Sequence, residues 1–307
     1  DYCFESIYIE GYDRGSTPLF EIEQLLSKLH KEFHMSLSPE ITIESTPDSP
    51  NLTKMPLLKK MGINRVVLKA YGLSNTYLQK LRVNYSAQSV RRAIETIFSA
   101  GFNNLSADVT YGKGRASAQH WFQELSTLAS LGVPHITAEA FIPNNSEDGP
   151  TTESQVESAN FDTSEGFAVI GRFTKSHGYL HYDVINMALT GYESRQNLAY
   201  TYHQPCLGLG PGAEGHTSGC RWHNFAEHQH YTRTLQEGGL PAFKESLTSL
   251  DMVNEHLLLG LRSRRGIHAE TFIKPYLPTN TYLQLLKALN QAFQQNRLRK
   301  SPDGSYY

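Results

Sequence analysis

Strand-like and helix-like segments alternate along the first 142 residues, and this alternation limits the possible folds of the chain more than any other feature. Short runs rich in Ile, Val and Thr predict strands at 6–9, 40–44, 65–68, 105–109 and 135–141. Apolar residues at three- and four-residue spacing predict intervening helices at 18–33, 52–61, 87–100 and 116–131. Strands joined in this way run parallel, so we expect a (β/α) barrel or an open doubly wound sheet.

Residues suited to helix ends support these boundaries. Thr17 followed by Pro18 predicts the start of the first helix, and Ser86 can cap the third. Glycines stand where helices should stop, at Gly62, Gly101 and Gly132.

The second half of the chain predicts a different organisation. The polar run 143–150 predicts a linker, 153–176 a helix and 182–185 a short strand, and helices follow at 225–237, 250–264 and 281–295. Asp303-Gly304 is a hairpin turn signal with one flank completed, and both chain ends look cut. We expect a barrel over 1–176, a glycine-rich extension over 177–222 and a small helical domain with a truncated wing over 223–307.

Composition excludes several functional classes. A formal charge of −2 gives no electrostatic reason to expect nucleic acid or an anionic membrane as the main partner. No apolar run approaches the roughly 18 residues of a membrane span, and the first residues are not typical of a signal peptide. Three widely spaced cysteines argue against a disulfide framework and indicate a reducing, cytoplasmic location.

Two neighbouring segments carry the most specific motif of the chain. Residues 191–200 read GYESRQNLAY, and residues 207–213 read LGLGPGA. They resemble the radical SAM family of oxygen-independent coproporphyrinogen III oxidases, and within it the heme chaperone branch, whose members carry PGYESRHNLxYW and YLGLGPGAHS. Similar matches occur in EITIESTPD at 40–48, GINRVVL at 62–68, GFNNLSADVTYG at 101–112 and the segment 257–267.

The resemblance implies a fold, a cofactor set and a function. It implies a partial (β/α)6 TIM-like barrel that begins at about the second strand, followed by a mostly helical, winged-helix-like C-terminal domain. The cofactors that the resemblance implies are S-adenosylmethionine, which we expect this chain to bind weakly, and a [4Fe-4S] cluster. The implied role lies in porphyrin or heme metabolism, with heme or another tetrapyrrole and heme-receiving proteins as partners.

Carboxylates at strand ends are the first candidate binding residues. Ligands of such barrels sit at the carboxyl ends of the strands, where Glu44, Asp108 and Glu139 would project. A carboxylate there can accept two hydrogen bonds from a ribose diol. The resemblance assigns that role to Glu44 and places Asp108 in the same site, while Glu139 could equally serve as a local cap or ion-pair partner.

The remaining cofactor positions depart from the family pattern. Ser16 and Thr17 lie in a run similar to GGGTP, which contacts the methionyl part of the cofactor, but they could equally cap the following helix. Tyr71 replaces a cofactor-contacting glutamine, Val83 replaces an arginine, and Ala140 falls in the same implied pocket.

The cluster motif is not found in this sequence. A radical SAM enzyme needs three thiolates in CxxxCxxC, whereas Cys206 and Cys220 are 14 positions apart and Cys3 is far from both. The motif either lies upstream of the first residue or does not exist. Buried, small apolar residues remain the better interpretation of the two later cysteines.

Histidines concentrate near the signature motif. Seven of the 13 lie between positions 177 and 230, and imidazole is the commonest proximal ligand of heme iron. The signature histidines of the family are Gln196 and Glu214 here, so we select His203 as the candidate axial ligand. Arg195, Asn197 and Tyr200 match the signature and either line the cavity or fix the loop by hydrogen bonds.

Three functional interpretations remain open. The chain is a divergent or partial family member, heme chaperone-like and not catalytic as it stands; or it is a cluster-free heme or tetrapyrrole carrier; or it is a scaffold subunit. We find no Walker loop and no GxGxxG at a strand–helix junction. Pro211 also lacks the backbone donor that a phosphate cradle would need.

Overall fold

The structure is a computed structural model of the 307-residue chain, and it describes residues 2–11, 18–112, 117–140 and 163–307. The chain divides into two compact units, Asp1–Gln196 and Asn197–Tyr307, which are described separately below. The expected linker at 143–150 lies outside the described residues.

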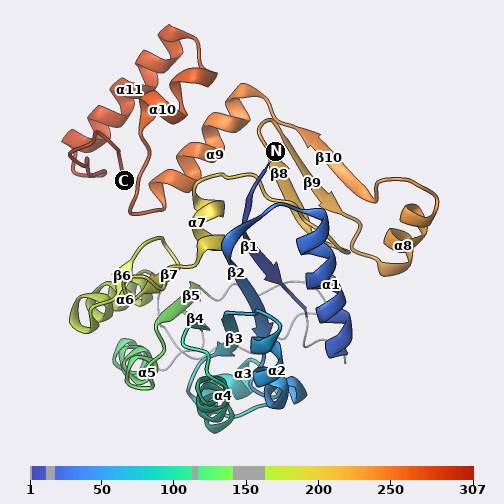
Figure 1. The fold of residues 1–307 in the computed structure, drawn as a ribbon. Coiled ribbons are helices and arrows are strands. Elements are labelled where there is room, and N and C mark those ends of the chain that lie inside the picture. The colour runs from blue at the N-terminus through green and yellow to red at the C-terminus, as the bar shows by residue number, and fades with distance from the viewer. Residues whose placement is uncertain (1, 12–17, 113–116, 141–162) are drawn as a thin grey trace. The chain divides into compact units, whose positions relative to one another are not determined.

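The first unit is built on a seven-stranded sheet of order β1-β2-β3-β4-β5-β7-β6 (Figure 1). Five strands follow the sequence order and run parallel: β1 (Phe4–Ile9), β2 (Met35–Ser45), β3 (Arg65–Tyr71), β4 (Leu105–Tyr111) and β5 (His135–Ala140). Two short strands complete the sheet in antiparallel orientation, β7 (Asn186–Ala188) against β5 and β6 (Leu180–His181) against β7. The α/β class and the parallel strands are confirmed.

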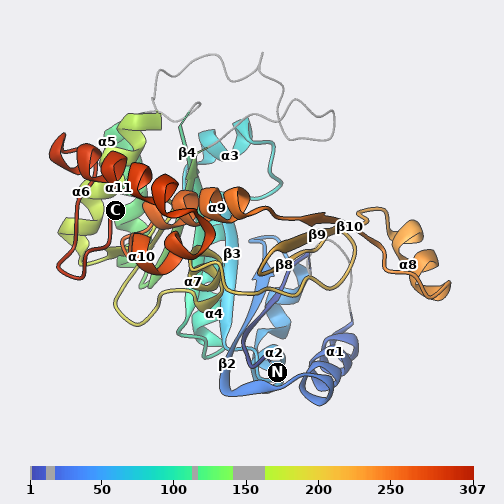
Figure 2. The ribbon, with the colours of Figure 1, turned by 90° about the horizontal axis from the view of Figure 1, so that it is seen from above.

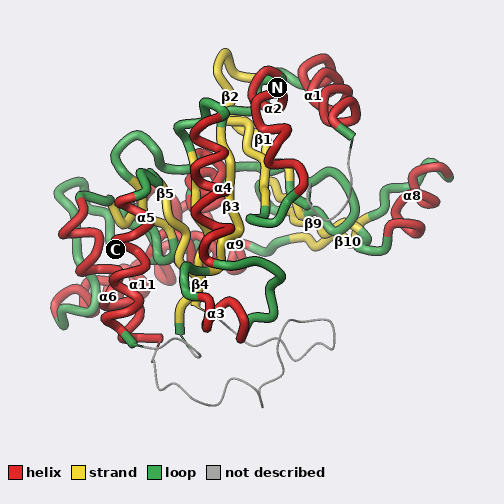
Figure 3. The backbone as a smooth tube through the Cα atoms, turned by 90° about the horizontal axis from the view of Figure 1, so that it is seen from below, coloured by secondary structure: helices red, strands yellow, loops and turns green. Residues whose placement is uncertain are grey.

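The predicted helices fill the crossovers between these strands. They are α1 (Leu19–Glu32), η2 (Pro50–Lys54) with α2 (Met55–Lys60), α4 (Ala87–Ser99), α5 (Ala118–Ser130) and α6 (Thr163–His177). Around the curved sheet of Figure 1 these helices lie on its outer side, and Figure 3 shows α4 running alongside β3. A further short helix, α3 (Asn75–Lys80), was not predicted.

The predicted helix ends are confirmed where the structure describes them. Ser86 forms a capping box with Ser89 at the start of α4. Gly62, Gly101 and Gly132 follow their helices with φ of 99°, 87° and 81°, a left-handed conformation that glycine adopts without steric cost.

The parallel strands present an apolar face to the helices and a polar face to the interior of the curve. In β4, Leu105, Ala107 and Val109 join the apolar core, whereas the alternating Ser106 and Asp108 face the other way. The polar inner face collects the candidate residues at the strand ends.

The second unit begins within α7 (Arg195–Thr201) and contains an antiparallel sheet that the sequence did not predict. Its strands are β8 (Glu214–Thr217), β9 (Cys220–Asn224) and β10 (Ala242–Ser246), in the order β10-β9-β8. The helix α8 (His228–Gln236) lies at one end of this sheet, between β9 and β10 in sequence (Figure 2).

Helices dominate the rest of the second unit. They are α9 (Ser249–Leu261), α10 (Ala269–Phe272), η4 (Lys274–Tyr276) and α11 (Thr279–Gln294). A small apolar core joins them, with Val253, Ile267, Ile273 and Tyr306 among its buried residues.

Two sequence expectations need correction. Residues 182–185 connect β6 and β7 rather than forming a strand. The terminal hairpin has both flanks: Arg299 and Tyr307 exchange backbone hydrogen bonds of 2.7 and 3.1 Å, and Tyr306 also pairs with Ile267. Residues 177–196 lie in the first unit, and the finer three-part division of the chain stays a prediction.

Candidate functional site

Four side chains from four neighbouring strands meet on the inner face of the first unit. The Tyr8 hydroxyl in β1 donates to Glu44 Oε1 in β2 at 2.7 Å. Lys69 Nζ in β3 lies 2.9 Å from the same Glu44 oxygen and 2.9 Å from Asp108 Oδ2 in β4. The two predicted carboxylates are thus brought together, and a lysine lies between them.

Burial and the neighbouring charges both act on the pKa values of this group. The side chains of Glu44 and Asp108 are only 13% and 17% exposed. Burial acts to lower the pKa of Lys69, but Asp108 and Glu44 outweigh it and raise that pKa above its ordinary value. Burial, followed by the charge of Glu44, raises the pKa of Tyr8. Lys69 is therefore a cation and Tyr8 a neutral donor at physiological pH.

The other strand-end predictions are placed as follows. Glu139 lies near the end of β5, where burial and then Asp108 raise the pKa of its carboxyl. Ala140 ends the same strand and is half-buried, and Tyr71 ends β3 with a left-handed φ of 53°. Ser16 and Thr17 lie outside the described residues.

A line of hydrogen bonds continues from Asp108 into the interior. Ser106 Oγ donates to Asp108 Oδ1 at 3.2 Å and lies 2.8 Å from His135 Nδ1, whose other nitrogen is 2.7 Å from the Tyr182 hydroxyl. Burial, followed by the charge of Arg65, lowers the pKa of His135 well below its usual value. His135 is therefore a neutral, structural histidine, which composition alone could not distinguish from a ligand.

The start of the signature helix α7 is fixed to β2. The buried Glu40 accepts hydrogen bonds at Oε1 from Arg195 N at 3.0 Å and from Gln196 N at 3.4 Å. Arg195 Nη1 donates to the Ser38 carbonyl at 2.7 Å, and Gln196 accepts from Ser6 at 2.6 Å. Of the two roles considered for Arg195, these contacts favour holding the loop in place.

The glycine-rich segment serves a structural purpose in the second unit. Asn224 Nδ2 donates to the carbonyls of Gly208 and Gly210 at 3.2 and 2.8 Å, and Gly210 N donates to the Tyr231 hydroxyl. A Cβ on Gly208 would lie 2.2 Å from the Glu214 carbonyl oxygen. Close backbone approach explains the glycine, and the amides of Gly210, Gly212 and Ala213 already have partners within the chain.

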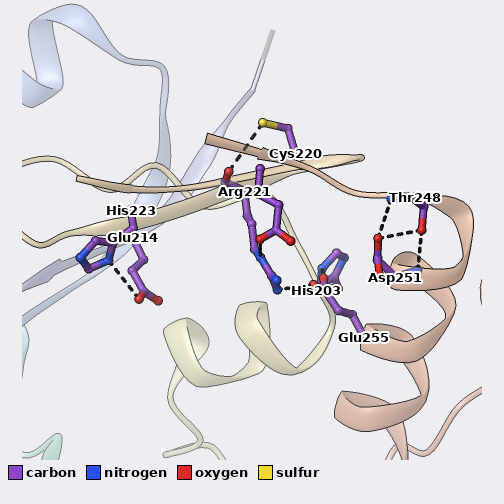
Figure 4. Close-up of polar contacts among 9 residues, drawn as sticks. His203, Glu214, Cys220, Arg221, His223, Thr248, Asp251 and Glu255 are labelled. Carbon is purple, nitrogen blue, oxygen red and sulfur yellow. Dashed lines mark hydrogen bonds and ion pairs between the residues drawn. The ribbon is translucent and has the colours of Figure 1, made fainter. Parts of the chain in front are cut away.

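A histidine cluster lies in the second unit beside α9. His203 Nε2, on a side chain that is 8% exposed, lies 2.5 Å from Glu255 Oε2, and Arg221 contacts the other Glu255 oxygen at 2.8 Å (Figure 4). The His203 ring stacks on His216 at 4.9 Å between centroids and meets His256 edge-on at 5.0 Å. His203 therefore has a carboxylate at the nitrogen that would bind iron.

His216 differs from His203 in this respect. Its Nε2 is buried and has no hydrogen-bond partner, while the ring makes a hydrogen bond with the backbone of Gln204. Burial, followed by the neighbouring His203, lowers the pKa of His216, so this ring is neutral. Tyr200, the signature tyrosine, lies 6.2 Å from it between ring centroids, and Asn197 lies on the same helix as Tyr200.

Comparison with known proteins shows a similarity to heme chaperones. The chain is 26% identical over 280 residues to the heme chaperone HemW of Bacillus subtilis, covering 85% of this chain and 72% of that protein. It is 25% identical over 277 residues to HemW of Lactococcus lactis, covering 87% and 71%. The predicted resemblance to the coproporphyrinogen III oxidase-like radical SAM family, in its heme chaperone branch, is therefore confirmed as a similarity over most of the chain.

The solved structures agree on the fold. Coproporphyrinogen III oxidase of Escherichia coli, a radical SAM enzyme, superimposes with a TM-score of 0.77 at 14% identity, covering 99% of this chain and 74% of that one. A scan against models of protein families finds no match. None of the helices in the described parts of the chain combines the length and apolar character needed to cross a membrane.

Donors from the chain itself already contact both carboxylates of the strand-end site. Glu44 Oε1 already receives hydrogen bonds from Tyr8 and Lys69, and Asp108 receives them from Ser106 and Lys69. A ribose diol that takes both oxygens of either carboxylate would compete with these donors.

The described residues do not supply a cluster site either. Cys3 is exposed, Cys206 and Cys220 are half-buried, and none of the three forms a disulfide among the described residues. Among the residues that the structure describes, no group of three or more His, Cys, Asp or Glu side chains is placed to hold a metal ion.

Sequence reasoning missed Lys69, Tyr8 and the histidine cluster. Tyr8 carries one usable signal, because it lies on the inward face of its predicted strand, and Lys69 directly follows the predicted strand 65–68. Neither His216 nor His256 carries a comparable signal, since their proximity to His203 arises from tertiary packing.

Proposed function

We propose that this protein binds heme and passes it to a receiving protein, and that its own residues do not perform radical chemistry. The observation that carries this proposal is the similarity to heme chaperones over more than four fifths of the chain. Cytoplasmic action is part of the proposal, since none of the three cysteines forms a disulfide among the described residues, which fits a reducing compartment.

The histidine cluster is the proposed place of iron ligation. A neutral imidazole binds iron through a nitrogen lone pair, and a hydrogen bond at the other nitrogen selects the required tautomer. His216 meets this condition, with Nε2 unpartnered and the ring bonded to the backbone of Gln204. His203 is the second candidate, because heme would have to displace Glu255 from its Nε2.

Binding at His216 requires a local opening of the loop, because the atom is buried. Tyr200 and the segment after it would move in that opening and line the heme, which agrees with the place of the signature motif. Arg195 and Asn197 would hold the start of the loop.

Hemin titration of the full chain tests the proposal. The Soret band should sharpen on binding, and His216→Ala should weaken binding by about tenfold or more, equivalent to ~1.4 kcal/mol. His228→Ala, an exposed position on α8, is the matched control and should bind as the wild type does.

The outcomes separate the candidates. If His203→Ala loses hemin affinity and His216→Ala binds hemin as the wild type does, His203 is the ligand. A wild-type protein that never sharpens the Soret band would contradict heme binding itself.

A further inference from the structure

We propose that Lys69 closes the strand-end nucleoside site of this chain by occupying the acceptor positions of Glu44 and Asp108. The ammonium group stands where hydroxyl donors of a ribose would have to bind. The proposal does not depend on heme binding, which concerns the second unit.

The first argument is a count of acceptor positions. A carboxylate oxygen accepts about two strong hydrogen bonds. Glu44 Oε1 has two donors, the Tyr8 hydroxyl at 2.7 Å and Lys69 Nζ at 2.9 Å. A diol that binds a carboxylate in bidentate fashion needs both oxygens, so one internal donor must leave before the diol can bind Glu44.

Both oxygens of Asp108 are also engaged by donors of the chain. Its Oδ2 faces Lys69 Nζ at 2.9 Å, and its Oδ1 accepts from the Ser106 hydroxyl at 3.2 Å. Ser106 is itself only 1% exposed and lies 2.8 Å from His135, so it cannot easily turn away.

The position of Lys69 is fixed from its backbone as well as from its ammonium group. The Tyr85 hydroxyl donates to the Lys69 carbonyl at 2.9 Å. The register between β3 and β4 shifts immediately after Lys69, which pairs with Asp108 directly across the strands. Lys69 and Asp108 therefore lie directly opposite each other on neighbouring strands, where opposite charges stabilise the pairing.

The ion pairs are too sheltered to be a solvated surface contact. The exposed fractions are 32% for the Lys69 side chain, 13% for Glu44 and 17% for Asp108. A nucleoside that binds either carboxylate competes with Lys69, and removal of the lysine should therefore favour its binding.

Calorimetry with S-adenosylmethionine and S-adenosylhomocysteine tests this inference on the full chain. Wild type should bind weakly or not at all, and Lys69→Ala should bind at least about tenfold more tightly. Adding Glu44→Gln to Lys69→Ala should remove the gain. Lys60→Ala, at an exposed position on α2, is the control and should behave as wild type.

A second measurement uses the wild-type protein and so does not depend on how any variant folds. Acetic anhydride labels only neutral amines, and a lysine held between two carboxylates remains charged. Mass spectrometry of peptides should show that Lys69 is labelled much more slowly than Lys60.

Either experiment can overturn the inference. A folded Lys69→Ala protein that binds S-adenosylmethionine no more tightly than wild type would refute it. Labelling of Lys69 as fast as Lys60 would show that the ion pairs do not form in solution.

Discussion

Replacement of Glu40 by alanine should loosen the attachment of the signature helix to the sheet. Glu40 is 6% exposed and accepts three hydrogen bonds at one oxygen, from Arg195 N at 3.0 Å and from Ser194 Oγ and Gln196 N at 3.4 Å. A carboxylate at the first amides of a helix also interacts favourably with the helix dipole.

The magnitude follows from these distances. A hydrogen bond to a charged group contributes about 1.5–3 kcal/mol, and the two longer contacts contribute less than the short one. Together they predict a loss of about 2–4 kcal/mol for Glu40→Ala. For a unit of this size, a loss of about 3 kcal/mol lowers the melting temperature by roughly 6–12 °C.

Scanning calorimetry and hydrogen exchange together measure the effect. The melting transition should fall for Glu40→Ala, and the amides of 195–201 should lose protection. Glu40→Gln keeps the size and the acceptor oxygen but not the charge, so its melting temperature should fall roughly half as far as that of Glu40→Ala. Glu95→Ala, at an exposed position on α4, is the control. A Glu40→Ala protein that melts with this control would refute the reasoning.

Two further predictions concern packing and pH. A Cβ on Gly215 would lie 2.2 Å from the Trp222 ring, so Gly215→Ala should cost about 1–3 kcal/mol by urea denaturation. Gly171 lies in a helix and has open space around it, so Gly171→Ala should instead raise the free energy of unfolding by up to about 1 kcal/mol. A Gly171→Ala protein less stable than Gly215→Ala would contradict this reasoning. The pKa of His135 is lower in the folded protein than in the unfolded chain. Its contribution to the free energy of unfolding is therefore fully present above about pH 6.5 and is lost on acidification. His135→Gln should therefore flatten the fall in melting temperature between neutral and acid pH; an unchanged slope would exclude it as a cause.

Much of the first unit could be predicted from sequence because its signals are local. Parallel strands buried under helices leave compact apolar runs, and Ser86 and Gly101 mark helix ends by their own chemistry. The helix α3 lacked such a signal, since it has only six residues. For the parallel strands and the helix ends, local propensity and tertiary structure agree.

The second sheet could not be predicted in the same way. β10, with the sequence AFKES, is mostly exposed and has no apolar alternation that would predict a strand. Its pairing with β9 spans the intervening α8, and such nonlocal pairing leaves no local pattern. The terminal hairpin also depends on a distant partner, because Tyr306 pairs with Ile267.

The candidate sites show the same limit. The rule that ligands bind at strand ends predicted that Glu44 and Asp108 lie close together, because both occupy inward positions of parallel strands, β2 and β4, on either side of β3. That Lys69 would bridge them depends on the register of β3 against β4, which places Lys69 opposite Asp108. The partner of His203, Glu255, lies 52 positions away, and no spacing rule connects the two.

Hemin titration of the wild-type chain, with and without excess S-adenosylmethionine, tests the central claim most directly. A heme carrier with a closed nucleoside site should form an equimolar complex with a sharpened Soret band, and its affinity should be unchanged by the nucleoside. The absence of an equimolar complex would contradict heme binding, and an affinity that depends on S-adenosylmethionine would contradict the closed site.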